Sequence, residues 1–176
     1  MTSPLSQPVA YANPPWWHVA WPTFLADSPV VGAAGEALAD MYRGLAQAGE
    51  QVAIPVPIAV AAARSPRDRL VLLSSAARDV VRSSIVELAA QDRVAGGTPL
   101  AAVGATSTAV HVVLCCPLET LHQRVGRLKS RTATLLAFSP ELGVGGRNTW
   151  ARGFWSVQLP SATAVQVVAR FVAAFG

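Results

Sequence analysis

The stretches RLVLLSSAARDVVRSSIVELAA (residues 69–90) and AVHVVLCCPLETLHQRVGRL (residues 109–128) decide the fold. Each begins with an apolar run of the kind that forms a buried strand. A short junction follows, and then apolar residues recur three and four positions apart. Such a change from strand-like to helical periodicity is typical of a strand followed by a helix. Two such units in succession predict a layered α/β domain, in which helices cover a sheet.

The flanking sequence adds further elements to these two units. We expect a helix between Pro29 and Gly49, strands at 52–62, 134–138 and 153–159, and a last helix at 162–175. The predicted order is therefore α-β-β-α-β-α-β-β-α. This order predicts a mixed sheet of about five strands flanked by helices, with the strand at 52–62 and the strand at 69–73 joined as a hairpin.

Composition indicates an ordered protein without a membrane span. The chain has 176 residues, of which 52% are hydrophobic and 14% charged, which suits one domain with a single core. The stretch 94–118, which has no charged residue, contains three glycines and two prolines and is densely apolar only in its last third. The N-terminus lacks the features of a secretory signal. The two cysteines of the chain are adjacent and cannot pair in an unstrained disulfide, so a reducing, cytoplasmic location is expected.

Residues 1–27 are rich in proline and tryptophan and carry no charge before Asp27. Because proline disfavours both helix and sheet pairing, we predict an extended arm here and a single α/β domain over residues 28–176. Indole side chains are enriched at the centres of protein interfaces. The candidate partner-binding residues are therefore Trp16, Trp17, Trp21, Trp150 and Trp155. The alternative is an arm that lies across the sheet of its own chain and stacks on Trp150 or Trp155.

Positive charge is concentrated in the C-terminal part of the chain. Residues 124–176 carry seven basic residues against Glu141 alone. The candidate anion-binding residues are Arg124, Arg127, Lys129, Arg131, Arg147 and Arg152. The loop GVGGR (residues 143–147) lacks both the last glycine and helix of a dinucleotide fingerprint and the Gly-Lys-Ser/Thr of a Walker loop. Its backbone N–H groups could still hold an anion. The alternative is a set of solvated arginines that keep an apolar protein soluble.

The motif CCP (residues 115–117) lies at a predicted strand-to-helix junction. Together with the predicted order of elements, it resembles in outline the zinc-dependent cytidine-deaminase fold over about residues 30–140. The resemblance concerns topology alone, because adjacent cysteines do not have the spacing of the zinc ligands and no His-x-Glu motif is present. Cys116 also lacks a histidine within reach as a base. We therefore predict no catalytic residue, metal or cofactor.

These observations favour a non-enzymatic protein-interaction or assembly domain. Its partner would be another protein chain or a second copy of itself, bound through the Trp/Pro arm and the basic C-terminal half. The alternative is binding of an anionic ligand or nucleic acid through Arg124–Arg131 and the loop between Gly143 and Arg152. A third class is a small-molecule enzyme that uses isolated residues such as Cys116 or Glu119.

Overall fold

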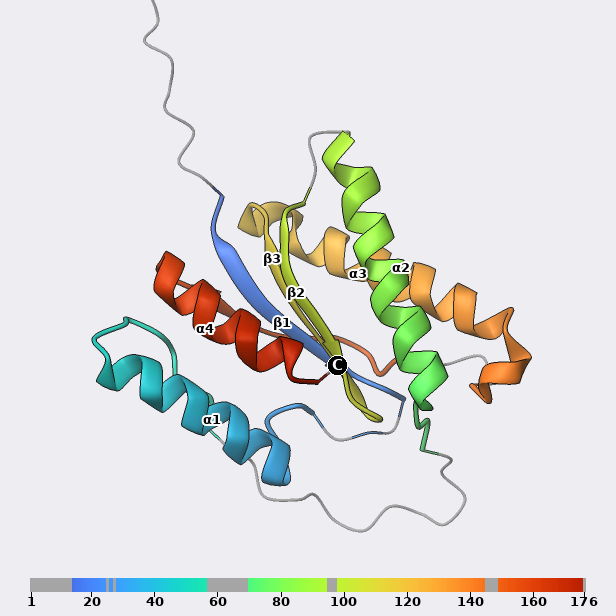
Figure 1. Cartoon of the computed structure of the whole chain (residues 1–176), viewed down its shortest axis with the longest axis horizontal. Helices are drawn as coiled ribbons and strands as arrows, with labels where there is room; N and C mark the ends of the chain where they lie inside the picture. The colour runs from blue at the N-terminus through green and yellow to red at the C-terminus, as the bar shows by residue number, and fades with distance from the viewer. Residues whose placement is uncertain are drawn as a thin grey trace, which may run out of the picture.

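The computed structural model describes residues 14–24, 26, 28–56, 70–94, 98–144 and 149–175. In these ranges the elements are β1 (Trp16–Pro22), α1 (Gly32–Gln47), α2 (Ser75–Val94), β2 (Leu100–Ala105), β3 (Ala109–Cys115), α3 (Leu118–Ala137), a 3-10 turn (Pro140–Leu142), β4 (Trp155–Leu159) and α4 (Ala162–Ala173). Helices α1 and α4 lie on one side of the sheet, and α2 and α3 lie on the other (Figure 1).

The four described strands form one sheet in the order β2-β3-β1-β4, and every neighbouring pair is antiparallel. Strand β3 thus lies between β1 and β2, which is the split βαβ arrangement. The predicted α/β class with flanking helices is confirmed. The mixed sheet of about five strands is corrected to an antiparallel sheet of four described strands. The topology does not support the comparison with cytidine deaminases, because no described strand forms a hairpin before α2.

Strand β1 corrects the prediction that residues 1–27 form an unpaired arm. Residues 16–22 pair with β3 on one side and with β4 on the other, at the centre of the sheet. The prolines do not break these ladders, because they flank the strand or end it at Pro22. Alternate side chains point to opposite faces, so Trp17, Val19 and Trp21 enter one layer of the core. The sheet therefore includes residues that we had assigned to the arm, and the rest of the domain division stays a prediction.

Three other expected strands differ from the structure. Residues 134–137 are the last turn of α3, since Leu136 continues the buried row of Leu121, Val125, Leu128 and Thr132. Residues 70–73 form no strand, although Val71 N–H bonds to the Phe24 carbonyl and Leu73 N–H to the Ser107 carbonyl. Residues 52–56 form no strand either, and 57–62 lie outside the described residues.

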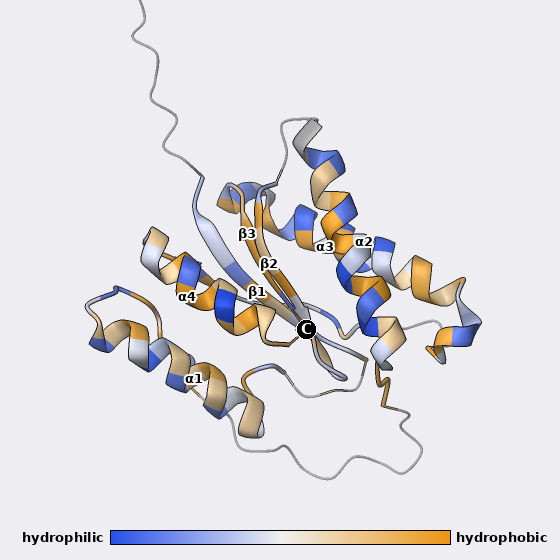
Figure 2. Cartoon of the chain, in the orientation of Figure 1, coloured by the Kyte–Doolittle hydropathy of each residue, from blue (hydrophilic) through white to orange (hydrophobic). Residues whose placement is uncertain are grey.

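The core has two layers, one on each face of the sheet. Between the sheet and α2 and α3 lie Trp17, Trp21, Val81, Ile85, Val112, Leu114 and Val125, among others. Between the sheet and α1 and α4 lie Leu38, Tyr42, Val113, Val157, Val168 and Val172. Strands β2 and β3 are largely apolar, whereas the helices carry both hydrophilic and hydrophobic residues (Figure 2). None of the described helices is long and apolar enough to cross a membrane.

Candidate functional site

The five tryptophans proposed as partner-binding residues pack within the chain. Trp17 and Trp21 are buried, and the Trp17 indole N–H donates to the Cys116 carbonyl at 3.0 Å. Trp21 lies edge-on to Trp150, with ring centroids 6.2 Å apart. Trp155 lies edge-on to His18 at 5.2 Å, and half-buried Trp16 borders the same layer of the core. Stacking within the chain, which was our alternative, accounts for these contacts.

Arg124 and Arg127 converge on one carboxylate at the end of α2. Arg124 is 3.3 Å and Arg127 3.1 Å from the carboxylate oxygens of Asp92, and Arg124 also donates to the Thr98 hydroxyl. With Thr120 and Gln123 they line a polar recess of about 200 Å³. One carboxylate cannot neutralise two guanidinium groups, so this recess keeps a net positive charge. The Arg127 side chain is 60% exposed.

Lys129, on α3, has a structural role. Its ammonium donates to the carbonyls of Ala151 and Gly153, at 2.7 and 2.6 Å, and burial lowers its pKa. Trp150 strengthens the same junction, since its indole N–H bonds to the Lys129 carbonyl at 3.0 Å. The turn that carries exposed Arg152 is thereby held against the second half of α3. Lys129 is consequently unavailable as a free cation, unlike Arg131, which is exposed. Arg147 lies outside the described residues.

The face of α3 that carries Arg124, Arg127 and Arg131 also ends in an exposed aromatic residue, which was not predicted from the sequence. Phe138, directly after α3, is 82% exposed, and Leu135 before it is 42% exposed. Positions seven apart in a helix lie within about 20° of one another, so Arg124, Arg131 and Phe138 share a face. We call Arg124, Arg127, Arg131, Leu135 and Phe138 the α3 stripe. Heptad spacing from the arginines was the signal in the sequence, but it was obscured by the expected strand at 134–138.

The adjacent cysteines do not form a reactive centre. Both are buried, and burial raises the pKa of each thiol, which disfavours the nucleophilic thiolate. The described residues contain no group of three or more metal-ligating side chains. The Cys116 thiol lies near Arg124, yet desolvation outweighs that positive charge.

No protein-family model and no curated protein matches the chain. Among the solved structures that are similar to it are two proteins described as transposases. One is a REP-associated tyrosine transposase bound to a REP hairpin, with 9% identity, a TM-score of 0.47, and coverage of 98% of this chain and 70% of that one. The other is a putative transposase from Deinococcus radiodurans R1, with 14% identity, a TM-score of 0.43, and coverage of 97% and 98%. The predicted assembly domain is wrong, because the tryptophans on which it depended pair within the sheet or pack against its core.

Proposed function

We propose that this chain binds single-stranded nucleic acid along the α3 stripe. The observation that carries the proposal is the shared face of Arg127, Arg131 and Phe138. Cations that meet phosphates and an aromatic ring that stacks on a base are the two elements of sequence-tolerant binding to single strands. The proposal develops the alternative that the sequence suggested, with Phe138 added and Lys129 assigned to structure.

The geometry of α3 makes the stripe continuous. A helix rises 1.5 Å per residue, so Arg124 and Phe138 lie about 21 Å apart along its axis. Helical rotation places Arg124, Arg127, Arg131, Leu135 and Phe138 within a sector of about 80°. The buried row of α3, from Leu121 to Leu136, lies in a separate sector. Phosphates along a strand could therefore follow the arginines without displacing the core.

Charge supports contact with a polyanion. Glu119 is the sole acidic residue in the sequence of α3, against Arg124, Arg127, Lys129 and Arg131. Arg124 is held in position by Thr98 and Asp92, which lowers the entropic cost of using it. Arg131 is exposed and forms no ion pair with any residue in the described ranges. Arg152 is not part of the stripe, because the turn held by Lys129 contacts α3 on the other side of its buried row.

Phe138 favours a single strand over a duplex. An 82% exposed phenylalanine leaves most of its ring in water unless a flat partner covers it. Bases in a duplex are stacked on one another and cannot offer their faces, whereas an unpaired base can. Stacking of this kind contributes about 1–3 kcal/mol per base.

The test is fluorescence anisotropy of a labelled 20-nucleotide oligo(dT) with the full chain over a range of salt concentrations. We expect affinity to fall with salt, and Arg131→Gln to lower the slope of log K against log salt by about 0.7, the value for one contact with a single strand. Phe138→Ala should weaken binding of oligo(dT) about fivefold or more and leave binding of a duplex unchanged.

Two matched variants control for net charge and for exposed apolar area. Arg43→Gln removes the same charge from α1, where Arg43 pairs with Glu36 and Asp40. Leu118→Ala removes an exposed apolar side chain from the opposite end of α3. Both should bind as the unmodified chain does. An affinity that does not change with salt concentration, or equal losses of affinity in Arg43→Gln and Arg131→Gln, would overturn the proposal.

A further inference from the structure

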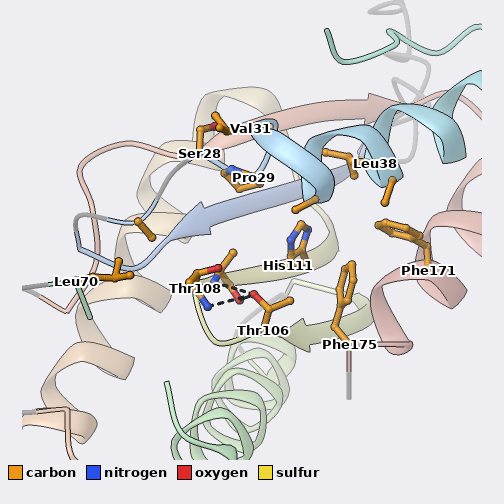
Figure 3. Close-up of a pocket in the computed structure, with 14 residues that line it drawn as sticks. Ser28, Pro29, Val31, Leu38, Leu70, Thr106, Thr108, His111, Phe171 and Phe175 are labelled. Carbon is orange, nitrogen blue, oxygen red and sulfur yellow. Dashed lines mark hydrogen bonds between the residues drawn. The ribbon is translucent and has the colours of Figure 1, made fainter. Parts of the chain in front are cut away.

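A pocket of about 240 Å³ lies on the face of the sheet that α1 and α4 cover, opposite the α3 stripe. It is bounded by the turn between β2 and β3, the start of α1 and the end of α4. His111, Phe171 and Phe175 project toward it, with Thr106 and Thr108 on the side of the turn (Figure 3). A 150 Å³ cavity accommodates benzene, so this volume has room for a larger planar molecule.

One ring nitrogen of His111 is already engaged. Nδ1 of His111 lies 3.1 Å from Nε2 of His18, and Nδ1 of His18 lies 2.8 Å from the Tyr42 hydroxyl. These three side chains therefore form a hydrogen-bonded row from α1 through β1 to β3. The row ends at Nε2 of His111, which has no hydrogen-bond partner among the described residues although His111 is only 6% exposed.

The row favours one assignment of the ring protons. Tyr42 is fully buried and its hydroxyl hydrogen has no other partner in the described part of the chain, so we assign the hydroxyl as the donor to Nδ1 of His18. A neutral His18 then carries its hydrogen on Nε2 and donates it to Nδ1 of His111. Burial lowers the pKa of His18 well below its ordinary value and that of His111 to about 4, so both rings are neutral near pH 7. His111 consequently presents an Nε2–H donor.

The walls of the pocket disfavour a charged ligand. Among the residues that the structure describes, the lining contains no Asp, Glu, Lys or Arg side chain. Phe175 packs on the His111 ring with centroids 4.9 Å apart, and Phe171 lies edge-on to Phe175 at 5.0 Å. Leu38 and Val31 add aliphatic surface from the beginning of α1. A charged ligand would lose its hydration here without gaining a counter-ion.

We propose that this pocket binds an uncharged, planar aromatic molecule of about two fused rings, which accepts a hydrogen bond from Nε2–H of His111. The ring of the ligand lies among Phe171, Phe175 and Leu38. Its acceptor, a ring nitrogen or a carbonyl oxygen, bonds to the Nε2–H donor, which faces no acceptor among the described residues. This site is independent of the nucleic-acid proposal, because it lies on the other face of the sheet.

The experiment is an NMR titration of the full chain, labelled with ¹⁵N-histidine, using quinoline as the probe. We expect the Nε2–H signal of His111 to move downfield and to saturate, while the signal of His122, on α3, stays in place. Naphthalene has the same shape without an acceptor, so it should perturb the pocket without producing the downfield shift. A His111 signal that quinoline does not move would overturn the proposal.

A second measurement uses the wall of the pocket and avoids any change to the histidine row. Phe175→Ala should weaken quinoline binding about threefold to tenfold, which corresponds to the loss of one aromatic contact. Phe138→Ala makes the same change on the opposite face and should leave quinoline affinity unchanged. Equal effects of the two variants would show that quinoline binds elsewhere, and the assignment of the pocket would fail.

Discussion

Nε2 of His18 lies 3.1 Å from Nδ1 of His111, across the pair of strands β1 and β3. The register places His18 opposite Val113 and His111 opposite Ala20, so the two histidines are diagonal neighbours on one face of the sheet. Their ring centroids are 5.4 Å apart. Both imidazoles are neutral near pH 7, because a positive charge on either ring would be buried and would have no carboxylate partner among the described residues.

This pair predicts loss of stability in mild acid. Both histidines have depressed pKa values in the folded state, so the unfolded chain binds more protons below its ordinary histidine pKa of 6.5. The contribution of the two histidines to the free energy of unfolding should therefore be constant above about pH 7 and fall as the pH drops from 6.5 towards 4. The limiting slope is about 1.4 kcal/mol per pH unit for each histidine. Urea denaturation followed at several pH values measures it, and a free energy of unfolding that stayed level between pH 6.5 and pH 4 would contradict the prediction.

Tyr42→Phe removes the hydroxyl that donates to Nδ1 of His18 and leaves that nitrogen buried without a partner. We expect the free energy of unfolding to fall by about 1–3 kcal/mol, the cost of an unsatisfied buried polar group. Chemical denaturation at pH 7.5 measures the change. An unfolding free energy equal to that of the unmodified chain would mean that the hydroxyl does not fix the protons of the histidine row.

Gly104→Ala tests the packing of α4 on β2. A Cβ atom at Gly104 would lie 2.1 Å from the backbone oxygen of Val172, so the helix must move away from the strand. We expect a loss of more than 2 kcal/mol in the free energy of unfolding. Gly126→Ala is the matched control, since nothing lies within 4 Å of its added carbon. In the helix interior that change should stabilise the chain by up to about 1 kcal/mol, and a destabilised control would contradict the assignment.

Lys129→Met keeps most of the aliphatic stem and removes the ammonium that bonds to the Ala151 and Gly153 carbonyls. We expect about 1–2 kcal/mol of destabilisation, because both carbonyls lose a charged donor. Hydrogen exchange measured by mass spectrometry should show faster exchange in the turn at 151–153. Unchanged exchange there would indicate that Trp150 alone holds the turn against α3.

Asp92→Asn tests whether an acidic residue competes with phosphates on the α3 stripe. Its carboxylate pairs with Arg124 and Arg127, so its neutralisation frees their charge. We expect tighter binding of oligo(dT) at low salt and a steeper salt dependence. Asp79→Asn provides the matched control, because Asp79 pairs with Arg82 on the same helix α2. Equal gains in the two variants would indicate a general charge effect and contradict a specific role for the stripe.

Local pattern was sufficient for much of the architecture. The helices α2 and α3 and the strand β3 follow from apolar periodicity within each segment, because an amphipathic element must bury its apolar side. Helices α1 and α4 were predicted on the same grounds. The basic character of the C-terminal half also follows directly from the sequence. Each of these features depends on neighbouring residues only.

The tertiary structure decided which segments pair and which charges stay free. Strand β1 carries the proline and tryptophan content of a surface arm, and only its pairing with both β3 and β4 places it at the centre of the sheet. His18 and His111 are 93 residues apart in the chain and meet through that register. In the same way, Asp92 and the turn at 151–153 determine that Arg124 and Lys129 are engaged while Arg131 is not. Contacts between distant residues depend on the packing of the whole chain, which local pattern does not encode.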